Sequence, residues 1–240
     1  TWERISDLLK QVGKPDAEFV GRDLGFELCR KDGVEMIVLG SVTKAGNTFV
    51  TDAKVLEVGT KKLLGTAGSR GESPDSILKN QVDELSRQIV KNAGISEGRA
   101  ASSKRIGEFT TNSLEAYKSY VMGVEELEKN RPHWRSYIVK AVELDPNFAR
   151  ALAQLGGESL KKAMALSNRV TDKEKLWIEA AYASQIEGDR SKAISIYKRI
   201  VNTYPKEKYA YYYLAGHFAA QAQFSEGIAM YQKAAEIDPY

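Results

Sequence analysis

The side chains in this sequence that could perform catalysis are few and widely spaced. The chain contains two histidines, His133 and His217, and a single cysteine, Cys29. Neither histidine belongs to an HExxH motif or has a second histidine at metal-binding spacing, so we predict no metal site. One cysteine excludes both an intrachain disulfide and a CxxC metal site. Because Cys29 falls on an apolar helical face, it is typical of a small core residue rather than a nucleophile.

The stretch GTAGSRG, residues 65 to 71, is the one segment whose glycines suggest phosphate binding. A Walker loop needs GxxxxGK followed by Ser or Thr, with the lysine neutralising the phosphate, and no lysine follows the glycine here. We therefore interpret the stretch as the glycine-rich end of a strand that leads into Ser73-Pro74. The kinase signature motifs are also missing. The sequence thus predicts no catalytic residue and no cofactor, although a longer parent chain could include a kinase or cyclase domain.

The charge distribution argues against a polyanionic partner. The net charge of the 240 residues is +3, and residues 1–107 and 108–240 are each nearly balanced. The basic pairs Lys61-Lys62 and Lys104-Arg105 are too short to form the clustered patch that phosphate backbones require, so nucleic acid is not an expected partner. No apolar run approaches the ~18 to 20 residues that span a bilayer.

The first hundred residues alternate helical and strand-like patterns. Apolar periodicity predicts helices over 1–13 and over 16–33, the second with Phe19, Leu24, Leu28 and Cys29 as apolar positions. Strand-like runs follow at 35–44, 47–58 and 61–70. Residues 45–47 (Ala-Gly-Asn) and Gly59-Thr60 are typical of hairpin turns. The alternation in the middle run predicts a sheet with one wetter face.

A further helix is predicted over 73–94. Ser73-Pro74 is a favourable start, because serine caps a helix and proline suits its first turn. We expect the buried stripe of this helix to be Ile77, Val82, Leu85, Ile89 and Val90.

The order of these elements, with the segment GVEMIVLGSVTKAGN and the hairpin KVLEVGTKKLL, resembles the TolB amino-terminal-like domain. The resemblance implies an α/β fold in which helices flank a mixed sheet. The family normally begins with a further strand, so the resemblance implies that the domain here lacks its first strand.

The second half of the chain repeats itself. KAVELDPNF at 140–148 is nearly matched by KAAEIDPY at 233–240, and KRIVNTYPKE at 198–207 is a degraded third copy. Pro205 and Pro239 are 34 residues apart, whereas Pro146 and Pro205 are 59 apart, nine short of two such periods. Apolar and small residues recur at helical spacing within each period, and proline ends the second helix.

This pattern resembles the tetratricopeptide repeat (TPR), a 34-residue helical hairpin that stacks into an all-α solenoid. The match is good in 113–146, strong in 174–207 and 208–239, and weak between Asn147 and Lys173. We expect about four hairpins, the second shortened around Gly156-Gly157, either truly or because a loop is missing from the sequence as given.

The two patterns predict two domains. We expect an α/β domain at 1–97, a linker at 98–108 and a TPR array at 109–240. Both ends of the chain suggest a fragment of a longer protein. Together the two domains resemble the C-terminal region of bacterial signalling proteins, in which a kinase or cyclase and a membrane helix often precede it. That context favours the extracytoplasmic side of the membrane over the cytoplasm.

The resemblance implies a protein or peptide ligand in the concave groove that the first helices of TPR hairpins line. The groove positions that it assigns here, by slot in the repeat, are Tyr117, Tyr120, Lys175, Ile178, Tyr182, Gln185, Tyr209, Tyr212 and Gly216. Tyrosine suits recognition because it combines a rigid apolar ring with a polar tip. The tyrosines could equally pack against a neighbouring hairpin. The groove also lacks the lysine and asparagine run of a carboxylate clamp.

We therefore expect a non-enzymatic scaffold or interaction module of a signalling protein. The alternative is a small-molecule sensing domain in the α/β part, relayed through the TPRs. A third hypothesis is self-association through the face of the shortened repeat.

Overall fold

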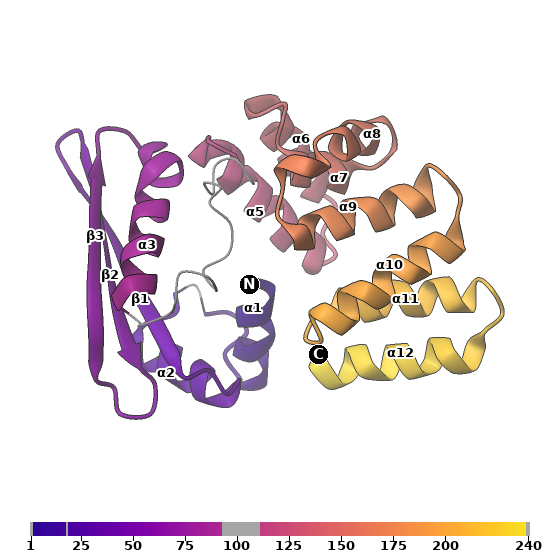
Figure 1. Ribbon diagram of the computed structural model, residues 1–240, viewed down its shortest axis with the longest axis horizontal. Coiled ribbons are helices and arrows are strands. Elements are labelled where there is room, and N and C mark those ends of the chain that lie inside the picture. The colour runs from indigo at the N-terminus through magenta and orange to yellow at the C-terminus, as the bar shows by residue number, and fades with distance from the viewer. Residues whose placement is uncertain (1, 18, 93–110, 239–240) are drawn as a thin grey trace. The chain divides into compact units, whose positions relative to one another are not determined.

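The computed structural model describes residues 2–17, 19–92 and 111–238. They divide into two compact units, one containing α1 to α3 with the three strands and the other containing α5 to α12 (Figure 1). The linker predicted at 98–108 lies outside the described residues.

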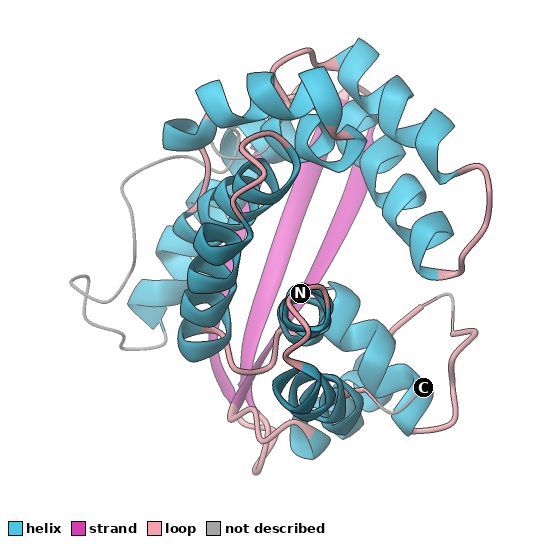
Figure 2. Cartoon of the chain, turned by 90° about the vertical axis from the view of Figure 1, so that its right-hand side faces the viewer, coloured by secondary structure: helices cyan, strands magenta, loops and turns pink. Residues whose placement is uncertain are grey.

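The first unit is built on three antiparallel strands. These are β1 (Met36–Ala45), β2 (Thr48–Glu57) and β3 (Leu63–Gly71), in the order β1-β2-β3. Ala45 pairs with Thr48, which leaves a two-residue turn that begins at Gly46 with φ 62°. Primed turns need this positive φ because their twist matches that of the strands. The predicted strands, which are magenta in Figure 2, are confirmed. In the described residues the sheet is antiparallel throughout, not mixed.

The two faces of the sheet differ as the alternation in β2 predicts. Thr51, Ala53 and Val55 are buried, whereas Asp52 and Lys54 between them are exposed. The buried face packs against a π-helical turn, η1 (Ile77–Gln81), and the helix α3 (Val82–Asn92) that continues it.

Helix α2 (Arg22–Lys31) covers part of the opposite face. Its Phe26 is fully buried in a cluster with Ile37, Leu56 and Val58. Gly25 permits this close approach, because a Cβ there would lie 2.9 Å from Cδ1 of Ile37. A second cluster joins α2 to α1 (Trp2–Gln11) through Leu8, Leu9 and Leu28.

Two details of the predicted helices are wrong. The second helix begins at Arg22 instead of residue 16, since Gly21 is extended with ψ 171°, and Phe19 before it is 80% exposed. The buried stripe expected in 73–94 is only half-buried, and Leu78 and Gln81 are the buried residues. The π-helical turn explains this difference, because its i→i+5 hydrogen bonds rotate the helix away from an ideal α-helical face.

The second unit is helical throughout the part that the structure describes, as predicted. Its helices follow one another as hairpins: α5 (Leu114–Glu128) with α6 (Trp134–Leu144), α7 (Ala149–Leu155) with α8 (Gly157–Ala165), α9 (Asp172–Gln185) with α10 (Arg190–Thr203), and α11 (Lys208–Ala219) with α12 (Phe224–Ile237). A 3-10 turn at Ser167–Arg169 precedes α9. The helices α7 and α8 are the short ones, and the chain reverses between them at Gly156, whose φ is 72°.

Small residues let the helices of this unit approach closely. Ala180 of α9 and Ala193 of α10 are fully buried in the cluster that joins the last two hairpins. A Cβ on Gly227 of α12 would lie 3.2 Å from the carbonyl oxygen of Ala215 in α11. The alanines and glycines that repeat in the sequence are therefore the points of closest helix packing.

A polar contact ties the end of three hairpins back to their beginning. The Thr111 hydroxyl donates to Asp145 Oδ2 at 2.6 Å, and Lys208 Nζ donates to Asp238 Oδ2 at 2.6 Å. Lys173 and Glu207 form the corresponding ion pair around the third hairpin. Asp145 and Asp238 are the aspartates of the repeated Asp-Pro sequence, so one reason for that repetition is hairpin closure.

Candidate interaction surface

Aromatic rings connect the helices of the last two hairpins. The Tyr197 and Tyr213 rings are stacked with centroids 5.7 Å apart, and Trp177 meets both edge-on at 5.7 and 5.9 Å. Tyr212 continues the series, with its ring 5.9 Å from Tyr213 and 5.5 Å from Tyr231 of α12. Such edge and offset geometries add to the energy of burial, so the rings hold one another in place.

This series extends to the first hairpins through Arg150 of α7. Its Nε donates to the hydroxyl of Tyr120 in α5 at 3.0 Å, and the Tyr120 ring lies 5.0 Å from that of Phe148. Arg150 is also close enough to Tyr213 for its positive charge to act on that phenol. Arg150 thus bonds to α5, and its charge also acts on a phenol of α11.

We call these residues the aromatic band. They are Tyr120, Arg150, Trp177, Tyr197, Tyr212, Tyr213 and Tyr231.

The band has a buried side and an exposed side. Tyr197 is only 4% exposed, whereas Tyr212 is 55% exposed and Tyr213 is 47% exposed. Burial, and less strongly the Tyr213 phenol, raises the pKa of Tyr197. Burial also raises the pKa of Tyr213, while Arg150 opposes that rise. Both phenols thus stay protonated at neutral pH, and the exposed Tyr213 presents its hydroxyl group at the surface.

His217 flanks the band, and its ring lies 5.5 Å from that of Tyr197. Burial, and then the charge of Arg190, lowers its pKa, which favours the neutral imidazole. The band at neutral pH is therefore a largely uncharged aromatic surface with one guanidinium group.

The structure places the predicted groove residues of α5 and α11 in different surroundings. Tyr120 and Tyr212 belong to the band, and Tyr117 is exposed on α5, one turn before Tyr120. Tyr209 is half-buried beside Lys208, whose Nζ lies 5.0 Å from its ring centroid. Gly216 is exposed on α11, so it adds no side chain to the surface.

The four predicted residues of α9 do not form one exposed row. Ile178 is fully buried with Leu160 and Ala163 in the core, so its assignment as a ligand contact is corrected. Tyr182 packs against the same cluster. Lys175 donates to Asn168 Oδ1 at 3.0 Å, and Gln185 is exposed at the end of the helix. The shortened α7–α8 hairpin explains the difference, since it packs directly over this face of α9.

Sequence reasoning missed Arg150, Trp177 and Tyr213 as members of the surface. Counting from Pro146 places Arg150 at the second slot of its repeat, which is a groove position, but the weak match of that repeat obscured the count. Trp177 packs partly buried against the core of the last two hairpins, whereas Tyr213 is 47% exposed.

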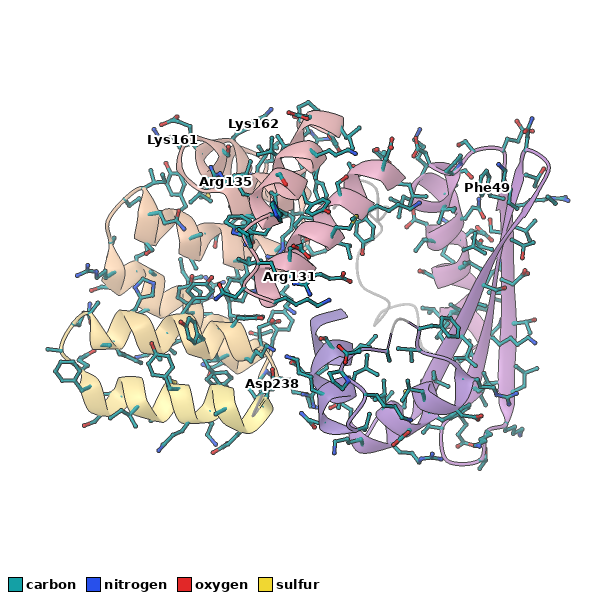
Figure 3. All side chains as sticks on the ribbon, turned by 180° about the vertical axis from the view of Figure 1, so that it is seen from behind. Phe49, Arg131, Arg135, Lys161, Lys162 and Asp238 are labelled. Carbon is teal, nitrogen blue, oxygen red and sulfur yellow. The ribbon has the colours of Figure 1, made fainter. Side chains whose placement is uncertain are left out.

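Other parts of the described chain offer less for binding or chemistry. Arg135 of α6 and Lys161 and Lys162 of α8 are basic, and Arg131, in the turn before α6, lies apart from them (Figure 3). Arg131 pairs with Glu126 at 3.0 Å and Lys161 with Glu158 at 2.6 Å, which reduces the positive charge of these basic groups. Burial, and then Asp32, raises the pKa of the Cys29 thiol, which disfavours the nucleophilic thiolate. No group of acidic, histidine or cysteine side chains in the described residues has a metal-binding arrangement.

GTAGSRG lies within β3 and not at the start of a helix. Gly65 accommodates α3, since a Cβ there would lie 2.5 Å from Cβ of Asn92, whereas Gly68 faces Asp52 of β2. Among the described helices, none is long and apolar enough to cross a bilayer.

Comparisons with known proteins leave the family open. No family model matches the chain, and no curated protein matches it. Among solved structures, the MamA RS-1 ArsTM double mutant is 19% identical, with 53% of this chain and 77% of that chain covered and a TM-score of 0.31.

A crystal structure of MamA is 17% identical, with 68% and 92% covered and a TM-score of 0.30. A further MamA crystal structure is 18% identical, with 65% and 82% covered and a TM-score of 0.30. TM-scores this low carry no argument about fold or function.

Proposed function

We propose that the second unit is a TPR-type interaction module, which binds a protein or peptide segment across the aromatic band. The observation that carries this proposal is the series of contacting rings from α9 to α12, in which Tyr197 is buried while Tyr212 and Tyr213 are exposed. Tyr120 and Arg150, which bond to each other, extend the band to the first two hairpins. Rigid aromatic side chains of this kind lose little conformational entropy on binding. The module is non-enzymatic in this proposal, and its place in a bacterial signalling protein rests on the sequence resemblance alone.

The chemistry of the band suggests the kind of segment that it binds. Tyr212 and Tyr213 offer apolar ring faces with hydroxyl tips, and Arg150 offers a planar cation that pairs well with a carboxylate. We therefore expect an extended or helical segment with apolar anchors and an acidic residue near them.

The experiment is a selection of displayed peptides on the whole 240-residue chain. The enriched peptides are then tested on the Tyr209→Ala/Tyr212→Ala variant, whose helicity is first checked by circular dichroism. We expect enriched peptides to combine apolar and acidic residues and to bind the variant at least about tenfold more weakly, or ~1.4 kcal/mol.

A matched control is Tyr137→Ala, which removes a tyrosine from α6, a second helix outside the band. Peptides that bind this control and the double variant equally well would contradict the proposal.

A further inference from the structure

The first unit contains a cavity on the wetter face of its sheet. It has a volume of about 440 Å³ and lies between the start of α2, the strands β1 and β2, and the turn before β3. Its lining residues are Arg22, Leu39, Gly40, Ser41, Asp52, Lys54, Leu56, Lys61 and Leu63. This volume is in the range of small-molecule sites, which are commonly ~300 to 1,000 Å³.

Three cations from three different elements line this cavity. Arg22 is the first residue of α2, Lys54 belongs to β2, and Lys61 belongs to the turn between β2 and β3. In the described part of the chain, none of the three forms an ion pair with a carboxylate. Asp52 is the one acidic residue of the lining, so the lining has a net positive charge.

The buried ring of Phe26 brings two of these cations together. Cζ of Arg22 lies 6.0 Å from the ring centroid and Nζ of Lys61 lies 5.4 Å from it. Like charges near one ring repel each other, and an anion between them relieves that repulsion. The cation–π contacts also hold both side chains at the cavity wall.

The backbone at Lys61 is strained, and its surroundings fix it. Its φ is 58°, a left-handed conformation that costs a non-glycine residue about 1 kcal/mol. The turn is closed by a hydrogen bond from Glu57 N to Lys62 O at 3.0 Å, and Lys62 N donates to Thr60 Oγ1 at 3.2 Å. This turn places the side chain of Lys61 above the ring of Phe26.

We propose that this cavity binds a small organic phosphate. Arg22, Lys54 and Lys61 hold the phosphate group, because a guanidinium fork and two ammonium groups match its charge and its acceptor oxygens. Leu39, Leu56 and Leu63 contact the apolar part of the ligand. This site is independent of the peptide surface proposed for the second unit, and it gives the small-molecule hypothesis a defined location.

The test is an NMR titration of the whole chain with three probes: phenyl phosphate, inorganic phosphate and phenol. Phenyl phosphate is expected to shift the backbone amides of Ser41, Asp52, Lys54 and Lys61 saturably. Inorganic phosphate is expected to shift them with weaker affinity, and phenol is expected to leave them unchanged. Shifts that do not saturate, or that spread over lysines outside the cavity, would overturn the proposal.

Variants separate the site from general attraction to basic residues. Arg22→Gln/Lys61→Asn is expected to weaken phenyl phosphate binding at least about tenfold, and asparagine tolerates the positive φ at position 61. Lys44→Gln, which removes an exposed lysine of β1 outside the cavity, is expected to bind as the original chain does.

Asp52→Asn provides a test that does not depend on a loss of function. Removal of the one negative charge in the lining is expected to tighten binding of phenyl phosphate, and the fold is retained because Asp52 is exposed. Equal affinity in Asp52→Asn and in Arg22→Gln/Lys61→Asn would overturn the assignment.

Discussion

At the scale of single residues, we expect Tyr197 to contribute to the response of the second unit to alkali. Burial raises the pKa of its phenol above the ordinary value of 10.0. The folded state therefore holds this proton more tightly than the unfolded chain does. The protonated Tyr197 phenol therefore increases the free energy of unfolding by its full amount below pH 10. This contribution is lost as the pH rises through the pKa of the folded state.

Tyr197→Phe removes that dependence while retaining the ring. We expect the variant to match the original chain in stability near neutral pH and to lose less stability between pH about 9 and about 11. Urea unfolding midpoints at the two pH values measure the difference. An equally steep alkaline loss in both proteins would show that Tyr197 is not the responsible group.

A substitution at Asp145 tests the contact with Thr111 that closes the first hairpin of the second unit. Its carboxylate accepts hydrogen bonds from the Thr111 hydroxyl at 2.6 Å and from Asn147 N at 3.0 Å. Asp145→Ala leaves the buried Thr111 hydroxyl without this acceptor, so we expect a loss of ~1 to 3 kcal/mol in the free energy of unfolding. The control is Glu143→Ala, which removes an exposed carboxylate from the last turn of α6, just before Asp145. This variant is expected to change the free energy of unfolding by less than ~0.5 kcal/mol.

At the scale of elements, two glycines of β3, Gly65 and Gly71, lie where the helical segment that contains η1 and α3 packs on the strand. A Cβ on Gly71 would lie 2.5 Å from Cβ of Ser76 and 3.0 Å from Nε2 of Gln81. Gln81 is fully buried, and its side chain bonds to Thr51 and Ser76, so it cannot move aside freely.

Gly71→Ala is therefore expected to destabilise the first unit by ~1 to 3 kcal/mol through overpacking. Chemical denaturation monitored by far-ultraviolet circular dichroism measures the loss. Gly59→Ala is the matched control, since a Cβ at that turn meets no atom within 4 Å. Equal stability of the two variants would contradict the close packing of η1 on β3.

Sequence patterns predicted elements well where a single periodicity prevailed. The strand alternation located β1, β2 and β3, and the repeated small residues located the paired helices. The predicted start of α2 and the predicted buried face of 77–90 were wrong, because an extended glycine and a π-helical turn leave no clear signal in the spacing of apolar residues. Ile178 was misassigned because packing by a shortened neighbouring hairpin is a tertiary effect. The cavity cations were not predicted, since their convergence depends on the turn at Lys61.

At the scale of the whole molecule, the two units have separate hydrophobic cores. Phe26 and Leu8 belong to clusters of the first unit, whereas Phe148 and Ile200 belong to clusters of the second. Units with their own cores can fold independently.

We therefore expect a fragment of residues 107–239 to fold alone. Its helical circular dichroism and the near-ultraviolet signal of its aromatic band are expected to match those of the second unit in the whole chain. A fragment with helical signal but no near-ultraviolet signal would show that the band requires the first unit.

The proposed function requires that the aromatic band binds a peptide. It is tested by a calorimetric titration of one selected peptide into the whole chain and into Tyr212→Ala, Arg150→Gln and Tyr137→Ala. We expect affinities at least about tenfold weaker for the first two variants and unchanged for the third. Unchanged affinity in Tyr212→Ala and Arg150→Gln, with both variants folded, would contradict it.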